Sequence, residues 1–187
     1  MASQGGYYRE RPRSRLAGKL VLLIVGVIVV AYAFACVQMQ SYSVLTNHIK
    51  IAQVHAVPTH KPGQMSIELI TYDNYGNQIS DTNYLVSGNR WKLEGDVIAY
   101  PSLLNIGGLH SGYKLTHLEG GNGNDDTPVS VIDLNGGDDN YFQTVHAQSW
   151  ASPVVKATDN TGSFLSPDRK LYDVFATPDG LSIVPSR

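Results

Sequence analysis

The feature that most constrains this chain is an apolar run, LVLLIVGVIVVAYAFACV, that extends from Leu20 to Val37 without a charged residue. Eighteen residues in a helix span about 27 Å, close to the roughly 30 Å hydrocarbon core of a bilayer. A helix satisfies its backbone hydrogen bonds internally, as a segment surrounded by lipid must. The sequence therefore predicts a transmembrane helix over residues 20–38.

The charges are sorted on either side of this run. Residues 1–19 carry five basic groups against one carboxylate, a net charge of +4, whereas the rest of the chain holds nine basic and fifteen acidic groups, a net charge of −6. By the positive-inside rule the basic arm is cytoplasmic and the chain beyond about residue 38 is exported. We therefore expect an inner or plasma membrane protein with a periplasmic or extracellular C-terminal domain. A negative exported domain gives no electrostatic support for nucleic-acid binding.

The sequence leaves open whether the apolar segment is retained. Ala33-Phe34-Ala35 matches an A-x-A cleavage pattern, and Ala35-Cys36 is similar to the end of a lipoprotein signal, with Cys36 as the lipidated residue. The hydrophobic length favours a retained anchor over both alternatives. Cys36 is also the only cysteine. An exported domain without a disulfide must fold on its hydrophobic core alone.

We expect a linker with helical character over residues 39–63, followed by an exported β-rich domain over residues 64–187. The linker residues with helical spacing are Tyr42, Leu45, Ile49 and Ala52. Beyond the linker the pattern has period two. Its clearest strand is residues 90–100, in which apolar Trp91, Leu93, Val97 and Ala99 alternate with charged side chains. This alternation predicts an antiparallel strand with one packed and one solvated face.

Turn-rich stretches separate several further short segments with strand character. We expect strands near residues 66–73, 84–87, 113–119, 129–134, 141–148, 154–157, 170–177 and 181–184. Roughly eight short strands with regular turns indicate a mainly β protein. The predicted architecture is an N-terminal transmembrane helix followed by an antiparallel β-sandwich or a small barrel-like domain.

Residues 101–109 (PSLLNIGGL) interrupt the strand pattern with an apolar cluster. Its members are Leu103, Leu104, Ile106 and Leu109. One interpretation is a short helix, begun by Pro101-Ser102, that closes one end of the sheet. The other is an exposed apolar loop that contacts the bilayer or a partner protein. We name the four residues as a candidate partner-binding surface.

Two Gly/Asp-rich stretches suggest a weak cation site. GGNGND at residues 120–125 matches the start of a calcium-binding nonapeptide, whose carbonyl and carboxylate oxygens are hard ligands. Thr127 stands where that repeat has an apolar residue, and the second stretch, NGGDD at residues 135–139, does not continue it. Two polar loops are the simpler interpretation. If the loops meet, the candidate ligands for Ca²⁺ are Asp125, Asp126, Asp138 and Asp139.

No motif in the sequence predicts catalysis. The chain lacks G-x-S-x-G, P-loop and dinucleotide-binding patterns. Its six histidines show neither the His-x-His nor the His-x₃-His spacing that is common at metal sites. We therefore expect no catalytic residue and no cofactor apart from the calcium hypothesis.

Several short segments of the exported part form a recognisable set: Arg90-Trp91-Lys92-Leu93, Asp96-Val97-Ile98, Leu104-Asn105-Ile106-Gly107-Gly108-Leu109, Tyr113-Lys114-Leu115, His146-Ala147 and Asp179-Gly180-Leu181. Together they resemble a group of uncharacterised bacterial single-pass membrane proteins that often carry an automatic cation/multidrug efflux pump label. One helix cannot enclose a transport path, so the resemblance implies an accessory subunit beside a larger membrane protein rather than a pump.

These observations lead to three hypotheses. The first is a non-enzymatic, membrane-anchored envelope protein that acts as an accessory or interaction subunit, with other membrane proteins as partners. The second is an anchored hydrolase or ligand-binding domain whose site residues are dispersed along the sequence. The third is a calcium-dependent module.

Overall fold

The computed structural model describes residues 15–46, 48–105, 108–123, 127–148, 155–159 and 163–186. The chain divides into two compact units, Met1–Val37 and Gln38–Arg187, of which we call the second the β domain. Helix α1 (Arg15–Gln38) contains the apolar run, and its large side chains are exposed, Leu22 at 75%. In the described part of the chain it is the one helix long and apolar enough to cross a membrane.

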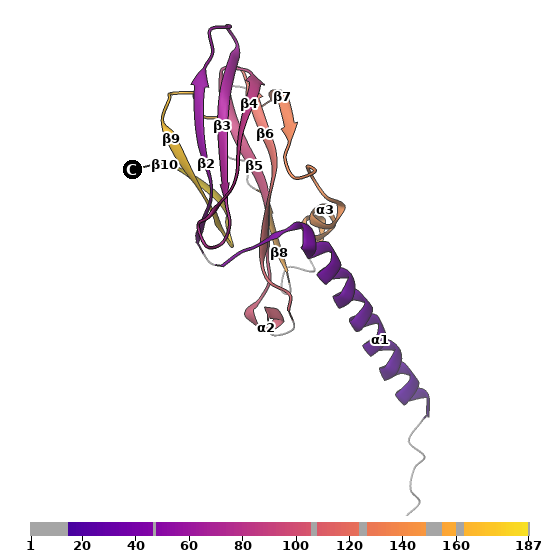
Figure 1. Cartoon of the computed structure of the whole chain (residues 1–187). Helices are drawn as coiled ribbons and strands as arrows, with labels where there is room; N and C mark the ends of the chain where they lie inside the picture. The colour runs from indigo at the N-terminus through magenta and orange to yellow at the C-terminus, as the bar shows by residue number, and fades with distance from the viewer. Residues whose placement is uncertain are drawn as a thin grey trace, which may run out of the picture. The chain divides into compact units, whose positions relative to one another are not determined.

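The β domain contains two antiparallel five-stranded sheets packed face to face (Figure 1). The first has the order β1-β6-β5-β8, with β7 also paired to β6, and the second has the order β10-β9-β2-β3-β4. The strands are β1 (Ser43–Val44), β2 (Ile49–Pro58), β3 (Gln64–Tyr72), β4 (Gln78–Ser87), β5 (Arg90–Ala99), β6 (Gly112–Gly121), β7 (Pro128–Asp133), β8 (Lys156–Asp159), β9 (Leu171–Thr177) and β10 (Gly180–Pro185). The predicted mainly β fold with a sandwich architecture is confirmed.

One hydrophobic core joins the two sheets. Met65 and Ile67 of β3 pack with Trp91 and Leu93 of β5 and with Leu118 of β6, and all five are fully buried. Burial of this apolar surface is the main force that holds one sheet against the other. A second, smaller cluster of Tyr42, Ile98 and Phe142 lies on the other face of β5.

The predicted helical linker over residues 39–63 is wrong. Only Met39–Ser41 forms a 3₁₀ turn, η1, and residues 49–58 form β2, which lies inside its sheet between β3 and β9. A β-bulge between Lys50 and Ala52 shifts the register there. One extra residue in a strand reverses which side chains face inward. The bulge therefore breaks the alternation along β2 that would otherwise have indicated a strand.

The predicted solvated face of residues 90–100 is also wrong. Strand β5 pairs with β6 and β8, and Trp91, Leu93 and Val97 are buried in the core as predicted. The opposite face is covered too, because Lys92 is only 8% exposed and Asp96 only 4%. Sequence alternation distinguishes apolar from polar faces, but it does not show whether another segment covers the polar face.

Residues 141–148, predicted as a strand, instead form the helix α3 (Asn140–Ala147). The Asp139 side chain accepts a hydrogen bond from the Phe142 backbone N–H at 2.7 Å and so caps the first turn. An aspartate at this position satisfies one of the free donors of a helix N-terminus. Phe142 then packs into the second cluster and fixes the helix on the sheet.

The apolar stretch at residues 101–109 contains a short helix, α2 (Ser102–Asn105), as one of the two interpretations predicted. It connects β5 to β6 at one end of the sandwich (Figure 1). Leu109 is buried, Leu104 is half-buried and Leu103 is 78% exposed, whereas Ile106 lies outside the described residues. The four candidate partner-binding residues therefore do not form one common exposed surface in the part that is described.

The two sheets approach each other closely where β4 ends. The Ser87 carbonyl oxygen accepts a hydrogen bond from Ser130 Oγ of β7 at 2.9 Å. A Cβ atom at Gly120 of β6 would lie 2.1 Å from that carbonyl oxygen and 2.5 Å from Val86 Cγ1. Only glycine fits here, because backbone atoms of the opposite sheet occupy the space that any side chain would need.

We predict that Gly120→Ala lowers the free energy of unfolding of the β domain by about 3 kcal/mol, since the sheets must separate to admit one methyl group. Chemical denaturation measures this change. Gly63→Ala is the control: it has φ +72° but no atom within 4 Å of its added Cβ, so it should cost only about 1 kcal/mol of left-handed strain. Equal losses for the two variants would contradict the close approach.

Candidate functional site

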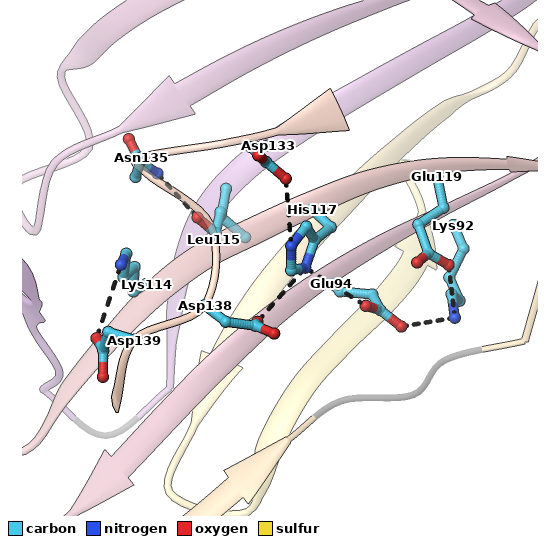
Figure 2. Close-up of polar contacts among 10 residues, drawn as sticks. All are labelled: Lys92, Glu94, Lys114, Leu115, His117, Glu119, Asp133, Asn135, Asp138 and Asp139. Atoms are coloured by element: carbon cyan, nitrogen blue, oxygen red, sulfur yellow. Dashed lines mark hydrogen bonds and ion pairs between the residues drawn. The ribbon is translucent and has the colours of Figure 1, made fainter. Parts of the chain in front are cut away.

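The outer face of the β5–β6 pair carries a network of charged side chains that are largely withdrawn from solvent (Figure 2). Lys92 Nζ lies 2.6 Å from Glu94 Oε1 and 2.8 Å from Glu119 Oε2. The Lys92 side chain is 10% exposed and that of Glu119 is 9% exposed. Phe164 covers the ammonium group, with 5.1 Å between Nζ and the ring centroid.

The hydrogen bonds of this network change the ionisation of Lys92. Burial alone would lower the pKa of the ammonium group, but the hydrogen bonds from Lys92 to the carboxylates of Glu119 and Glu94 outweigh it and raise the pKa above its ordinary 10.5. Lys92 is therefore charged under all physiological conditions. Because the Lys92 ammonium group pairs with both Glu94 and Glu119, it neutralises two carboxylates at once and links them in one network.

His117 joins three carboxylates from different segments. Its Nδ1 lies 3.7 Å from Glu94 Oε2 and 3.6 Å from Asp138 Oδ1, and its Nε2 lies 3.4 Å from Asp133 Oδ1. Figure 2 shows the imidazole between these groups. Within the described part of the chain, the recorded polar contacts of His117 are with carboxylates and not with a serine or threonine hydroxyl. These contacts differ from the pairing of a base with the hydroxyl or thiol of a nucleophile.

The loop between β7 and α3 is held over this face by both charge and backbone conformation. Asp139 Oδ2 lies 3.6 Å from Lys114 Nζ, and the same carboxylate caps α3. Asn135, Gly136 and Gly137 have φ values of 49°, 86° and 68°. Asn135 Nδ2 donates a hydrogen bond to the Leu115 carbonyl oxygen at 3.1 Å. Three consecutive residues in the left-handed region turn the chain back onto the sheet.

Tyr42 lies beneath this loop. Burial raises the pKa of its phenol well above the ordinary range, and the hydrogen bond and negative charge of the neighbouring Asp139 add to that effect. The hydroxyl therefore stays protonated. Tyr42, which follows η1 directly, thus connects the beginning of the β domain to the loop that carries Asp139.

A cleft of about 410 Å³ opens between the two sheets beside this network. At one edge, β6 pairs with β1 at Gly112 and Tyr113 and with β7 from His117 onward, so the two short strands leave a gap between them. The cleft lies at this gap, opposite β4 of the other sheet. Its volume is within the range of small-molecule sites, roughly 300–1,000 Å³.

The cleft wall combines buried apolar side chains with neutral polar ones. Ile51, Leu69 and Leu115, each nearly inaccessible, form its apolar part. The polar lining from the linker and the β3–β4 sheet comprises Ser41, Ser43, Thr71, Tyr72, Ser80 and Tyr84. The lining from β6 and the loop after β7 includes Tyr113, Lys114, Asp133 and Asn135. Asp133 and Lys114 connect the cleft to the charged network.

The four candidate calcium ligands are not brought together in the described residues. Asp138 faces His117 and Asp139 caps α3, while Asp125 and Asp126 lie outside the described part of the chain. Among the residues that the structure describes, no group of three or more His, Cys, Asp or Glu side chains is arranged to hold a metal ion. The calcium hypothesis therefore stays a prediction.

The cleft was not predicted from the sequence. Its residues come from six separate segments, and inner-facing residues such as Leu69 and Thr71, or Ser80 and Tyr84, are equally typical of ordinary strands. One feature of the sequence does point to the cleft: near the end of β3 the inner-facing residue changes from apolar Leu69 to Thr71, which carries a hydroxyl. From one sequence, however, this change looks the same as a strand that simply leaves the core.

Comparison of the chain with protein-family models, with curated proteins and with solved structures gave no match. The resemblance to single-pass proteins labelled as efflux pumps therefore stays a prediction.

We predict that Lys92→Met destabilises the β domain by about 3 kcal/mol near neutral pH, because two withdrawn carboxylates lose their cation. The pKa of Lys92 is raised on folding, so its contribution is fully present below pH 10.5 and is lost as pH rises through the folded value. The stability difference between wild type and variant should therefore shrink above pH 10.5. Urea denaturation at pH 7 to 11 measures both effects.

Lys156→Met is the matched control for this prediction. Lys156 Nζ also lies within hydrogen-bonding distance of a carboxylate, 2.7 Å from Asp179 Oδ1, but its side chain is 56% exposed. An exposed ion pair contributes little, so this variant should remain close to wild type. If Lys92→Met were as stable as Lys156→Met, the pairing of Lys92 with its two carboxylates would not contribute to the stability of the β domain.

Proposed function

We propose that this chain is a single-pass, membrane-anchored envelope protein whose β domain recognises another envelope component as an accessory subunit of a membrane complex. In this proposal the basic arm is cytoplasmic and α1 holds the protein in the inner or plasma membrane. The β domain is exported and acts by binding rather than by catalysis.

The observation that carries the proposal is the cleft between β4 and the gap in the opposite sheet. In this cleft polar side chains lie over the buried apolar residues Leu69 and Leu115 of the core, and a domain with a purely structural role has no need of such an opening. Concave sites that combine an apolar surface with a few oriented polar groups are typical of ligand recognition. The cleft is therefore the part of the β domain best suited to contact another molecule.

Binding is favoured over hydrolysis by the contacts of His117. A general base must be within hydrogen-bonding distance of the group that it activates. The imidazole instead contacts Glu94, Asp133 and Asp138, which restrain the β7–α3 loop. These contacts support a scaffold that keeps the cleft wall in place.

A second surface is consistent with the accessory role. Leu103 of α2 is 78% exposed, and the neighbouring Leu104 is half-buried. The Leu45 N–H donates to the Ser111 carbonyl oxygen, so α2 and the first residues of the β domain lie at the same end of the sandwich. An exposed leucine at this end is suited to contact a neighbouring membrane protein.

The topology is tested by cysteine accessibility in a Cys36→Ser background. Tyr75→Cys places a thiol in the β3–β4 turn, where Tyr75 is 90% exposed, and Ser3→Cys places one in the basic arm. In intact spheroplasts a membrane-impermeant maleimide should label only Tyr75→Cys, and Ser3→Cys should react after lysis. The reverse labelling would contradict the orientation. A Tyr75→Cys protein found in the soluble fraction would contradict the retained anchor.

The accessory role is tested with a variant in which the cleft is filled. Ser43 lines the cleft and is exposed, so Ser43→Trp should occupy the opening without disturbing the core. Ser182→Trp on β10 is the matched control, since Ser182 is exposed and does not line the cleft. We expect the wild type and Ser182→Trp to co-purify with the same stoichiometric partner in mild detergent. The amount of partner recovered with Ser43→Trp should be at least tenfold lower. Purification of the wild type as a monomer alone would contradict the proposal.

A further inference from the structure

We infer that the cleft is a binding site for a neutral pyranose sugar, so that the envelope component recognised by the β domain carries a glycan. This inference rests on the proposed function and names the ligand class of the same site. Three features of the cleft support it: the neutrality of its polar groups, the pairing of its hydroxyls and the mixture of aromatic and apolar surface beside them.

The polar wall of the cleft is mainly neutral. Of the fifteen described residues that line it, eight carry a hydroxyl or an amide, five are apolar and two are charged. The two charged residues already have partners, Lys114 with Asp139 at 3.6 Å and Asp133 with His117 at 3.4 Å. A phosphate or carboxylate ligand would find little uncompensated positive charge here, whereas a neutral ligand needs none.

The hydroxyl groups can act as both donors and acceptors, as sugar hydroxyls do. Thr71 Oγ1 and Ser80 Oγ are 2.7 Å apart and face each other from neighbouring strands of one sheet. Tyr113 Oη on the opposite sheet lies 3.5 Å from the Tyr72 carbonyl oxygen. Burial raises the pKa of Tyr113, so its hydroxyl remains a donor. A sugar between the sheets would therefore meet hydroxyls from both sides.

The apolar part of the cleft suits the C–H faces of a sugar ring. A pyranose ring presents C–H groups on its faces and hydroxyls at its edge, and the C–H faces pack on aromatic and aliphatic side chains. Tyr84 packs against the core and also lines the cleft beside Leu69. A lipid chain would leave the many hydroxyls of this wall without partners, at a free-energy cost for each one buried.

The test uses the full chain in phosphatidylcholine nanodiscs, free of glycoside detergents. The probes are N-acetylglucosamine and glucose, with glucose 6-phosphate as the charged analogue and sorbitol as the open-chain analogue. For a dissociation constant of about 1 mM, roughly 20 mM sugar multiplies the folded-to-unfolded ratio about 20-fold. We expect the melting temperature to rise by roughly 5 °C with at least one neutral sugar, and not with the two analogues.

Variants distinguish the cleft from other surfaces. Tyr84→Ala should weaken binding of the neutral sugar at least tenfold in saturation-transfer NMR, whereas Tyr75→Ala, at an exposed tyrosine outside the cleft, should leave binding unchanged. If Tyr84→Ala does not fold, Ser43→Trp takes its place, since it fills the opening from the exposed edge. Binding that survives Ser43→Trp would overturn the inference.

The outcomes separate the ligand class from the proposed function. No stabilisation by either neutral sugar, or a larger effect of glucose 6-phosphate, overturns the sugar inference. If Ser43→Trp nevertheless releases the membrane partner, the accessory function stands and the cleft binds protein instead. If a sugar binds in the cleft while the partner is retained by Ser43→Trp, the sugar inference stands and the cleft is not the subunit contact.

Discussion

The β domain is held together by burial between its two sheets and by no covalent cross-link. The single cysteine of the chain, Cys36, belongs to α1, so no disulfide is available to the domain. The sheets are in close contact where Gly120 meets the Ser87 carbonyl oxygen. Away from that contact the side chains at the inner positions change from Met65 and Ile67 to Thr71, and the cleft begins. The cleft therefore lies where hydroxyl residues replace the large apolar side chains that fill the space between the sheets near Gly120.

On the outer face of β5 and β6, the domain has a layer of paired charged side chains in addition to its hydrophobic core. Withdrawn charges rarely stabilise a protein more than apolar residues of the same size would, but they penalise any arrangement that leaves one of them unpaired. Lys92 requires Glu94 and Glu119, and Lys114 faces Asp139. This requirement fixes the path of the β7–α3 loop over the sheet. Since the same loop supplies Asn135 to the cleft wall, the polar layer also determines the shape of the candidate site.

Most strand positions follow local rules and were predicted from the sequence, whereas the order of the strands in the two sheets was not predicted. The alternation around Trp91 and Leu93 and the turns between strands both depend on near neighbours, so they are readable from one chain. Two failures arose from local features that the period-two pattern does not register, and the third arose from tertiary structure. The bulge at Lys50 hides β2, and the cap by Asp139 turns residues 140–147 into a helix. The cleft depends on the gap between β1 and β7 along β6, a tertiary feature that no local pattern encodes.

The same gap relates the beginning of the β domain to the candidate site. Strand β1, only two residues long, occupies the edge of β6 immediately after η1, and Ser41 and Ser43 from this stretch line the cleft. Tyr42 between them is buried against Ile98 and Phe142. The residues that follow α1 in sequence are thus part of the cleft wall and are fixed on the sheet by an aromatic anchor. Displacement of this stretch would remove two hydroxyl-bearing residues from the wall, so the shape of the candidate site depends on the position of the first residues of the domain.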